Sequence, residues 1–368
     1  MIVRPLTEYC TLNMGQSPDS KTYNTQGKGL PFYQGNADFG ETHPITHVWC
    51  SAPVKVAEDG DILISVRAPI GAMNMAVERC CIGRGLAALT PIRNKCSKQF
   101  LYYALQSKVD SLIAQGTGST FKAISKKVLE ATCIPAYSTI EQEQIAETIG
   151  HVDNTIAARR KQLALLDQLV KSRFIELFGE PLSNQKGWQT MSIVEAAPIK
   201  SQRGNLADEV WLLNLDAVEA QTGTVLFKHR VQSGEINAST VYFTAESVLY
   251  SKLRPYLNKV VMPDEDGVAT SEMIPMCPLA DRLNRAYLCY WLRSDAFVRH
   301  ISEKVAGAKM PRVSMDYFRS LAIEMPPLEL QEQFAAFVEQ TDKSKLAVQK
   351  GLQELEILKK SLMQQYFG

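Results

Sequence analysis

A long internal repeat constrains the fold of this chain more than any other feature of its sequence. Residues 171–179 resemble residues 360–368, and the two segments lie 189 positions apart. The same offset aligns Gln142 with Gln331, and towards the N-terminus it drifts by two or three residues. Solenoid repeats are only about 20–50 residues long. The repeat therefore predicts two copies of a whole domain, each followed by the same appendage.

Composition places the chain among ordinary globular proteins. Its 368 residues are 45% hydrophobic, which is enough to form a core in each of two domains. No apolar run approaches the roughly 18 residues of a membrane span, and the N-terminal residues do not resemble a signal peptide. We therefore expect a cytoplasmic protein. The eight cysteines include no C-x-x-C pair and are interpreted as buried, small apolar side chains.

Two short segments resemble metal sites but lack the residues that would complete them. His43, His47 and Cys50 have the spacing of metal ligands, but no second pair accompanies them, and true zinc spacings are specific. A structural role is favoured for these three residues. The acidic-x-Lys triplet at residues 19–21 has no upstream acidic partner of the kind that nucleases use, so it is interpreted as loop. The sequence predicts no metal site.

Two segments are predicted to form long helices. From Glu141 to Phe178 there is no proline and only one glycine, and apolar residues recur at alternating spacings of four and three. This pattern is typical of a heptad seam, and the second copy keeps it at the C-terminal end. Each helix could merely cover its own domain, but a seam sustained in both copies favours helices that pack on each other. The predicted helix-pair interface comprises Ile145, Ile149, Val152, Ile156, Leu163, Leu166, Val170, Phe334, Val338, Val348, Leu352, Leu355 and Leu362.

The globular parts of the two copies have a mixed α and β pattern. Residues 61–66 and 247–251 are predicted to be buried strands, and residues 99–113 and 284–305 are predicted to be helical. We classify the fold as α/β (α+β), with two similar domains joined by two long antiparallel coiled-coil helices in a pseudo-two-fold internal repeat. The expected parts are a first domain at 1–135, a central helical spacer at 136–180, a second domain at 181–325 and a C-terminal helical spacer at 326–368.

Motifs of catalysis are absent from the sequence. It contains no G-x-x-x-x-G-K-[ST] phosphate loop, no G-x-S-x-G elbow, no H-E-x-x-H helix and no N/D-P-P-Y/F motif of adenine methyltransferases. Residues 83–85, Gly-Arg-Gly, are too few for a dinucleotide-binding fingerprint and are interpreted as a turn. The sequence therefore predicts a non-catalytic chain, with a methyltransferase or nuclease of unrecognised motifs as the alternative.

Basic residues occur at duplicated loop positions. Residues 118–125 align with residues 307–314, and both segments combine glycine with lysine or arginine. Glycine lets the backbone approach a phosphate, lysine and arginine supply charge, and the arginine fork matches two acceptors of guanine. The net charge is only +1, so a nucleic-acid binder would have to gather its basic residues on one face. The candidate DNA-binding residues are Arg67, Arg84, Lys122, Lys126, Lys127, Lys252, Arg254, Lys309 and Arg312.

The order domain, helix, domain, helix resembles that of the specificity subunits of type I restriction-modification systems. The residues that carry the resemblance are Ile-Ser-Lys-Lys at 124–127, the proline and Glu-Gln segment at 135–144, and the strand motif at 247–255, together with the Phe-Gly that ends each helix. The second copy opens with Lys-Gly-Trp at 186–188. The first copy begins directly at Met1, as a shortened N-terminus would leave it.

This resemblance implies a DNA-binding chain of a host-defence restriction system, in which each target-recognition domain reads one half of an asymmetric, bipartite DNA site. The helices would fix the distance between the halves. The chain itself would hold no cofactor. Two modification (methyltransferase) subunits would use S-adenosylmethionine to methylate adenine, and restriction (translocase/nuclease) subunits would use ATP and Mg. Independently of the resemblance, one chain with two related but different domains suits an asymmetric site, whereas a homodimer prefers a palindrome. A coiled-coil scaffold without a nucleic-acid role is a further alternative.

Overall fold

Two helices of equal length dominate the structure. Helix α4 spans Thr139–Phe178 and helix α9 spans Leu328–Phe367, and each contains 40 residues. Both therefore confirm the long helices that the heptad pattern predicted. The computed structural model in which they are seen describes residues 2–118, 122–201, 207–236, 239–307 and 309–368.

Local sequence signals explain where α4 begins and ends. At its start the Ser138 N–H donates to the Glu141 carboxylate at 2.8 Å, and the Glu141 N–H donates to the Ser138 hydroxyl at 3.3 Å. This reciprocal pair is a capping box, which satisfies N–H groups that have no partner within the helix. At its end Gly179 has a φ of 82° and its N–H donates to the Ile175 carbonyl at 2.8 Å. Glycine adopts this left-handed conformation without strain, so it can terminate the helix.

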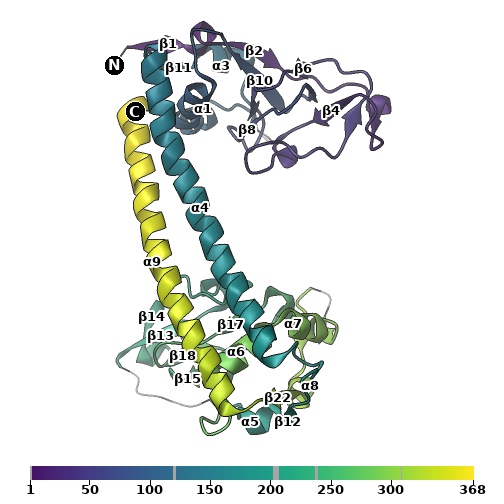
Figure 1. The fold of residues 1–368 in the computed structure, drawn as a ribbon, viewed down its shortest axis with the longest axis vertical. Coiled ribbons are helices and arrows are strands. Elements are labelled where there is room, and N and C mark those ends of the chain that lie inside the picture. The colour runs from purple at the N-terminus through teal and green to yellow at the C-terminus, as the bar shows by residue number, and fades with distance from the viewer. Residues whose placement is uncertain (1, 119–121, 202–206, 237–238, 308) are drawn as a thin grey trace. The chain divides into compact units, whose positions relative to one another are not determined.

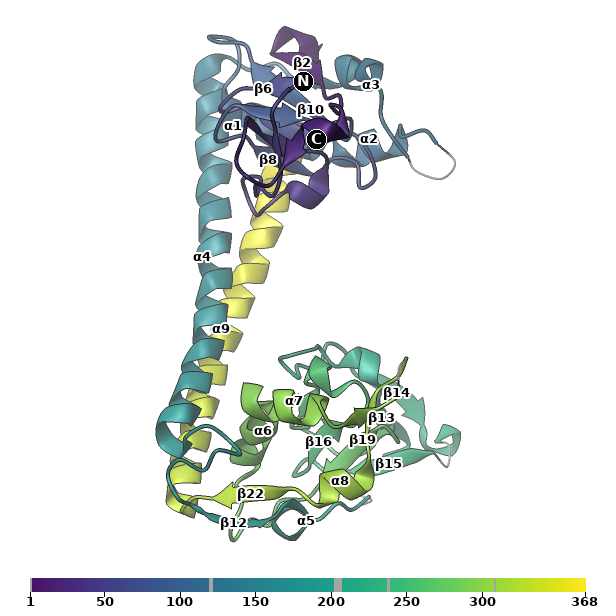
Figure 2. The same cartoon turned by 90° about the vertical axis from the view of Figure 1, so that its right-hand side faces the viewer.

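The protein divides into two compact units, which Figures 1 and 2 show from two directions. Unit 1 comprises residues 1–159 and 351–368, and unit 2 comprises residues 160–350. Each unit thus holds one domain together with the parts of α4 and α9 that pack on it.

In unit 1 a four-stranded antiparallel sheet of order β2-β10-β7-β8 carries the core, and a second sheet has the order β3-β5-β4-β9-β6. The helices are α1 (Lys98–Ser107), α2 (Val109–Ala114) and α3 (Lys126–Ala131). The strands are β1 (Val3–Pro5), β2 (Cys10–Met14), β3 (Tyr23–Asn24), β4 (Leu30–Tyr33), β5 (Trp49–Cys50), β6 (Val56–Ala57), β7 (Ile62–Ser65), β8 (Met73–Met75), β9 (Cys80–Ile82), β10 (Leu86–Pro91) and β11 (Cys133–Pro135).

In unit 2 the corresponding core sheet has the order β17-β16-β19, and a second sheet has the order β14-β13-β18-β15. The helices are α5 (Ile193–Ala196), α6 (Arg285–Arg293), α7 (Asp295–Ser302) and α8 (Met315–Arg319). The strands are β12 (Gln189–Ser192), β13 (Glu209–Leu213), β14 (His229–Gln232), β15 (Thr240–Phe243), β16 (Val248–Ser251), β17 (Val260–Val261), β18 (Gly267–Thr270), β19 (Met273–Met276), β20 (Val305–Ala306), β21 (Arg312–Val313) and β22 (Ala322–Met325).

Strands β7 and β16 are buried on both faces, as their unbroken apolar sequences predicted. In β7, Ile62 and Ile64 face a core shared with α1, whereas Leu63 faces a core shared with β9. In β16, Val248 and Tyr250 face the core of α6 and α7. Alternate side chains of a strand point to opposite faces, so both strands connect two cores of their own unit.

The first strands of the two units pair in the same way. Strand β1 is antiparallel to β11, with Val3 opposite Pro135, and β12 is antiparallel to β22, with Gln189 opposite Met325. The first domain therefore has an opening strand although it lacks the Gly-Trp segment of the second. In unit 2, β12, β22 and α5 lie together (Figure 2). The predicted mixed fold with a duplicated domain is confirmed.

Two predicted helices are each divided into two. The prediction for residues 99–113 corresponds to α1 and α2, which meet at Lys108, and the prediction for 284–305 corresponds to α6 and α7. Ser294 separates α6 from α7 because its backbone is extended and its side chain accepts a hydrogen bond from the Phe297 N–H. A serine in this position favours a new helix start over continuation.

The interpretation of all eight cysteines as buried was wrong for two of them. Cys133 is exposed and Cys277 is partly exposed, whereas the other six are buried. Cys133 lies on β11, where Ile134 faces the core. Because neighbouring strand residues alternate between faces, the burial of Ile134 turns the Cys133 side chain outward.

Candidate nucleic-acid interface

The loops that follow β7 and β16 are held by the same main-chain hydrogen bonds. In unit 1 the Val66 N–H donates to the Gly85 carbonyl at 2.9 Å, and in unit 2 the Lys252 N–H donates to the Glu272 carbonyl at 3.0 Å. We call these positions the duplicated frame. It comprises residues 65–68, 85 and 122–124 in unit 1, and residues 251–254, 272 and 311–313 in unit 2.

Three more hydrogen bonds complete the duplicated frame in each unit. Two join the loop to the segment before α3 or α8, and one joins a serine hydroxyl to the loop. In unit 1 they run from Ala68 N to Lys122 O (3.1 Å), from Ile124 N to Val66 O (2.9 Å) and from Ser65 Oγ to Arg67 O (2.8 Å). In unit 2 they run from Arg254 N to Pro311 O (2.8 Å), from Val313 N to Lys252 O (3.0 Å) and from Ser251 Oγ to Leu253 O (3.0 Å).

The side chains on the duplicated frame differ between the units. Where unit 2 has Glu272 and Arg312, unit 1 has Gly85 and Ala123. The hydrogen bonds also place Ala68, rather than Arg67, in the position of Arg254. Two sets of loops that share these hydrogen bonds therefore present different chemical groups.

In unit 1 the structure brings three of the predicted basic residues to the frame. Arg67 forms a β-bridge with Ala123, Lys122 is next in the chain to that bridge, and Arg84 precedes Gly85. All three side chains are exposed. Lys126 and Lys127 are also exposed but lie on the first turn of α3, where the Lys126 ammonium is 3.2 Å from the Glu130 carboxylate.

In unit 2 the remaining four predicted residues surround the same position. Arg254, Lys309 and Arg312 are exposed and Lys252 is partly buried. Arg254 Nη2 donates to the Lys309 carbonyl at 3.5 Å, and Arg312 bridges to Leu253 through the backbone. Other parts of the predicted segments, Ser119, Thr120, Phe121 and Ala308, lie outside the described residues.

Arg254 has a left-handed backbone with φ 49° and ψ 63°. This conformation costs a non-glycine residue roughly 1 kcal/mol and is found more often at functional sites than elsewhere. The bond from its N–H to the Pro311 carbonyl and the bond from the Leu257 N–H to its own carbonyl hold the conformation. The strain supports a functional role for this loop.

Glu272 was not among the predicted site residues, although it makes the best-defined ion pair of the frame. Arg312 Nε donates to both Glu272 oxygens at 3.1 and 3.2 Å, and Arg312 Nη2 donates to one of them at 3.0 Å. These bonds raise the pKa of the Arg312 guanidinium above its ordinary value. The sequence signal for Glu272 was its alignment with the turn at Gly85. Its pairing with Arg312 has no local pattern in the sequence, because the two residues lie 40 positions apart.

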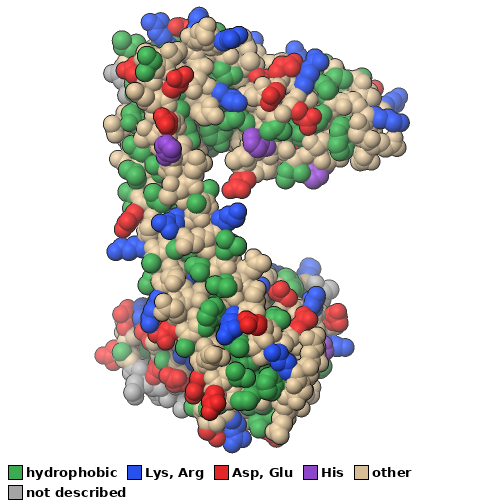
Figure 3. All heavy atoms as spheres, in the orientation of Figure 1, with side chains coloured by type: hydrophobic (Ala, Val, Ile, Leu, Met, Phe, Trp, Pro, Cys, Tyr) green, Lys and Arg blue, Asp and Glu red, His purple; other side chains and the backbone are tan. Residues whose placement is uncertain are grey.

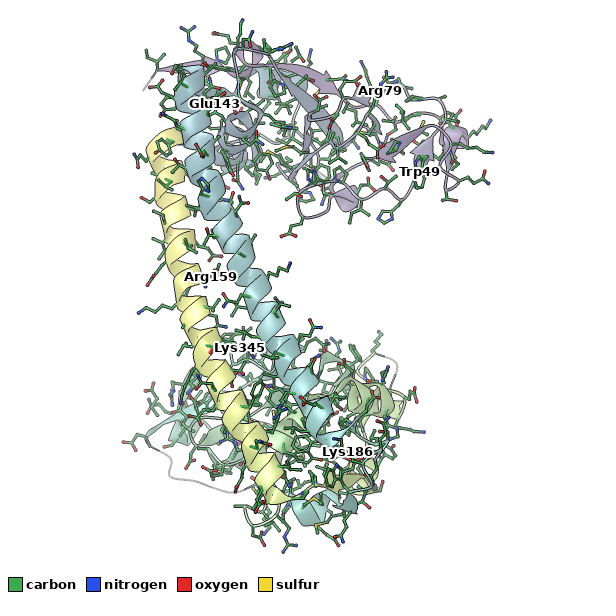
Figure 4. The ribbon with its side chains drawn as sticks, in the orientation of Figure 1. Trp49, Arg79, Glu143, Arg159, Lys186 and Lys345 are labelled. Atoms are coloured by element: carbon green, nitrogen blue, oxygen red, sulfur yellow. The ribbon has the colours of Figure 1, made fainter. Side chains whose placement is uncertain are left out.

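The parts of α4 and α9 within each unit run antiparallel and are joined by an ion pair. In unit 1 the Lys359 ammonium lies 2.7 Å from the Asp153 carboxylate. In unit 2 the Lys345 ammonium, labelled on α9 in Figure 4, lies 2.6 Å from the Asp167 carboxylate. Lys345 and Lys359 are mostly shielded from solvent, with side-chain exposures of 17% and 23%.

The predicted seam residues are buried or partly buried throughout. Those next to each domain also pack on its core, as Ile145 and Ile149 do in unit 1 beside Phe367. In unit 2 the Phe174 and Phe178 rings of α4 meet the Phe334 ring of α9 edge-on, with centroids 5.3 and 5.6 Å apart. Buried members are Ile145, Ile149, Val152, Ile156, Val170, Phe334, Val338 and Val348, and partly buried members are Leu163, Leu166, Leu352, Leu355 and Leu362.

Large apolar side chains are also exposed on the helices. Leu165 on α4 and Leu346 on α9 are 53% and 68% exposed in unit 2, and Ile357 on α9 is 69% exposed in unit 1. Leu346 lines a pocket of about 420 Å³ together with Val338 of α9 and Ala286 of α6.

Charged side chains of both signs are mixed on the face drawn in Figure 3. In both units, lysine and arginine are interspersed with aspartate and glutamate there.

No group of three or more His, Cys, Asp or Glu that could hold a metal occurs among the residues that the structure describes. In the segment with metal-like spacing, His43 Nδ1 lies 3.0 Å from the Met75 carbonyl, and Cys50 is buried beside Phe32. The triplet at residues 19–21 forms a turn in which Asp19 accepts a hydrogen bond from the Lys21 N–H. None of the described helices is both long and apolar enough to span a bilayer.

Comparison with known proteins identifies the repeated domain. The type I restriction modification DNA specificity domain matches residues 1–168 and, a second time, residues 186–357. The MjaX type I restriction enzyme specificity subunit of Methanocaldococcus jannaschii is 41% identical over 164 residues, which cover 45% of this chain and 39% of that protein. The matched part thus spans well under two thirds of that relative. The MjaIX specificity subunit of the same organism is 22% identical over 95% of this chain and 88% of its own length.

The whole fold also has a counterpart among solved structures. The S subunit of a type I restriction-modification system from M. genitalium matches 100% of this chain and 96% of its own, with a TM-score of 0.61 at 15% sequence identity. At this identity the likeness concerns the fold, including the succession of two domains and two long helices.

Proposed function

We propose that this chain, which belongs to the type I restriction-modification DNA specificity domain family, recognises an asymmetric, bipartite DNA sequence. Each unit would read one half of that sequence with the residues around its duplicated frame. The observation that carries this proposal is the duplicated frame itself, which repeats the main-chain hydrogen bonds and changes the side chains. Identical surfaces would prefer two identical half-sites, whereas different surfaces suit two different ones.

The chain would act as the non-catalytic, DNA-reading component of a larger complex. The curated relatives are specificity subunits of type I restriction enzymes. By extension, two methyltransferase subunits would methylate adenine with S-adenosylmethionine, and restriction subunits would use ATP and Mg. Exposed apolar side chains of α4 and α9, such as Leu165 and Leu346, support the helices as a partner surface. The proposal places this complex with DNA in the cytoplasm.

Binding to DNA should depend steeply on salt. The basic residues of the frame would displace counterions from the phosphates, so affinity should fall about 10- to 1000-fold between 50 and 200 mM salt. Fluorescence anisotropy with the chain and its methyltransferase partner measures this fall. Methylome sequencing of cells that carry both proteins should then reveal one asymmetric site with an unread spacer.

Each alternative function has its own signature in these experiments. Salt-independent affinity and no methylated site would support a scaffold without a DNA role. Calorimetric binding of S-adenosylmethionine to the isolated chain would support an enzyme with unrecognised motifs. Methylation at a palindromic site would contradict the assignment of a different half-site to each unit.

A further inference from the structure

The Glu272–Arg312 ion pair occupies the duplicated frame of unit 2. Glu272 lies in the turn between β18 and β19, where its N–H donates to the Thr270 hydroxyl at 3.2 Å and its carbonyl accepts from Lys252. Arg312 begins β21 and bridges to Leu253. Both side chains therefore start from backbone that hydrogen bonds hold in place. The pair is partly open to solvent, with side-chain exposures of 44% for Arg312 and 24% for Glu272.

The carboxylate of Glu272 binds one particular edge of the guanidinium. It accepts from Nε and Nη2 of Arg312, at distances of 3.0 to 3.2 Å. The fork formed by Nη1 and Nη2 points away from the carboxylate because the guanidinium is planar. That second fork also offers two N–H groups, as a bidentate pairing with the O6 and N7 acceptors of guanine requires. An arginine held along its side thus keeps its end available for a base.

The charge of the pair favours a base edge over a phosphate. Arg312 and Glu272 together carry no net charge, so the pair would release few counterions, and the carboxylate would repel an adjacent phosphate. A neutral base edge suffers no such repulsion. Fixing the side chain beforehand also reduces the conformational entropy that arginine loses on binding.

We propose that Glu272 is a positioning residue that presents Arg312 to a guanine in the half-site read by unit 2. This inference rests on the proposed function and assigns that unit a specificity determinant that unit 1 lacks. In unit 1 the equivalent residues are Gly85 and Ala123, and a Cβ added at Gly85 would lie 2.4 Å from the Gln34 carbonyl oxygen. The other half-site is therefore an internal control.

The test compares the methylated sequence produced by four versions of the full chain in cells with the methyltransferase partner. These are the wild type, Glu272→Gln, Arg312→Ala and the double variant. We expect both single variants to relax the same guanine position, by roughly 10- to 100-fold in preference, and to leave the other half-site unchanged. In the double variant the loss should equal that of Arg312→Ala alone, because Glu272 acts through Arg312.

A matched control is Glu265→Gln, which removes a carboxylate that pairs with Arg230 and Lys228 elsewhere in unit 2. It should leave both half-sites intact. Thermal unfolding of each variant, alone and with its partner, separates a change in reading from loss of the fold, and the nearly isosteric glutamine keeps the shape of the site.

Four outcomes would overturn the inference. Glu272→Gln could leave the guanine preference intact. It could instead alter the preference at a different base position, which would mean that Glu272 contacts a base directly. It could strengthen binding to every DNA sequence equally, which would mean that Glu272 acts only by repelling the DNA phosphates. Arg312→Ala could also leave the sequence unchanged. If the wild-type chain directs methylation to no defined sequence, the proposed function itself is contradicted. The wild-type measurement alone distinguishes this result from failure of the inference about Glu272.

Discussion

Gln331 makes in unit 2 the three hydrogen bonds that Gln142 makes in unit 1, and both side chains are fully buried. Each glutamine lies at the start of a long helix and binds the main chain of its own domain. Gln142 Oε1 accepts from Ser97 N (3.0 Å), and its Nε2 donates to Lys95 O (3.0 Å) and Tyr137 O (3.0 Å). Gln331 Oε1 accepts from Asn284 N (2.7 Å), and its Nε2 donates to Arg282 O (3.1 Å) and Pro326 O (2.8 Å).

Replacing Gln331 with leucine should therefore destabilise unit 2 by about 2–4 kcal/mol, because buried main-chain groups lose their partners. Denaturation in urea, with hydrogen exchange to locate the loss, measures the change. The control Gln333→Leu alters an exposed position on the same helix turn and should cost less than about 0.5 kcal/mol. Equal costs for the two variants would contradict a role for the buried hydrogen bonds.

Reversing the charge of Asp153 should weaken the packing of α4 on α9. An Asp153→Lys variant places two ammonium groups together at Lys359, and we expect a loss of about 1–2 kcal/mol, since the position is only partly buried. Adding Lys359→Asp restores an ion pair and should recover most of that loss. Glu354→Lys, at an exposed position of α9, serves as the control. A double variant no more stable than Asp153→Lys would show that the ion pair does not hold the helices.

Lengthening both helices by one heptad should lengthen the unread DNA spacer. Seven residues inserted after Arg159 and seven after Lys350 preserve the seam and add about 10.5 Å to each helix. At roughly 3.4 Å per base pair, the spacer should grow by about three base pairs while both half-sites stay the same. Insertion into α4 alone shifts the seam and should abolish a defined site. Methylome sequencing decides between these results, and an unchanged spacer would show that the helices do not measure the DNA.

The cysteines should differ widely in reactivity. Burial raises the pKa of the Cys10, Cys80 and Cys96 thiols to about 12, so almost none of each is thiolate at pH 8. Cys133 is exposed and should be alkylated first. Peptide mass spectrometry after brief treatment with iodoacetamide gives the order of labelling. Rapid labelling of Cys10 or Cys80 in the folded chain would contradict the buried positions of β2 and β9.

The parts of the fold that depend on local pattern could be predicted from the sequence. The heptad spacing of α4 and the unbroken apolar run of β7 are patterns of neighbouring residues. The repeat at an offset of 189 is visible when two segments of the chain are compared directly. The break at Ser294 was missed because a serine is compatible with either a helix interior or a cap. Cys133 was misassigned because only one face of its strand packs on the core, and Ile134 rather than Cys133 lies on that face.

The site was predictable only in outline. Basic residues at duplicated positions directed attention to the loops of the duplicated frame, but the partner of each arginine depends on turns that bring distant segments together. Glu272 reaches Arg312 only because a turn after β18 and a bridge to Leu253 meet there. Sequence alignment also gave Arg67 and Arg254 similar positions after their strands, whereas the main-chain bonds separate them by one residue. A shift of one residue places a different side chain at the same hydrogen-bonded position.

The duplicated frame separates the atoms that stabilise the loop from the atoms that would read DNA. Its hydrogen bonds join mainly N–H and carbonyl groups, which every residue except proline supplies in full. Substitutions at positions such as 123 and 312 therefore change the exposed chemistry without removing the bonds that shape the loop. A lineage could exchange the sequence it recognises through a few surface substitutions, each nearly neutral for folding, and one half of the chain could change while the other kept its preference.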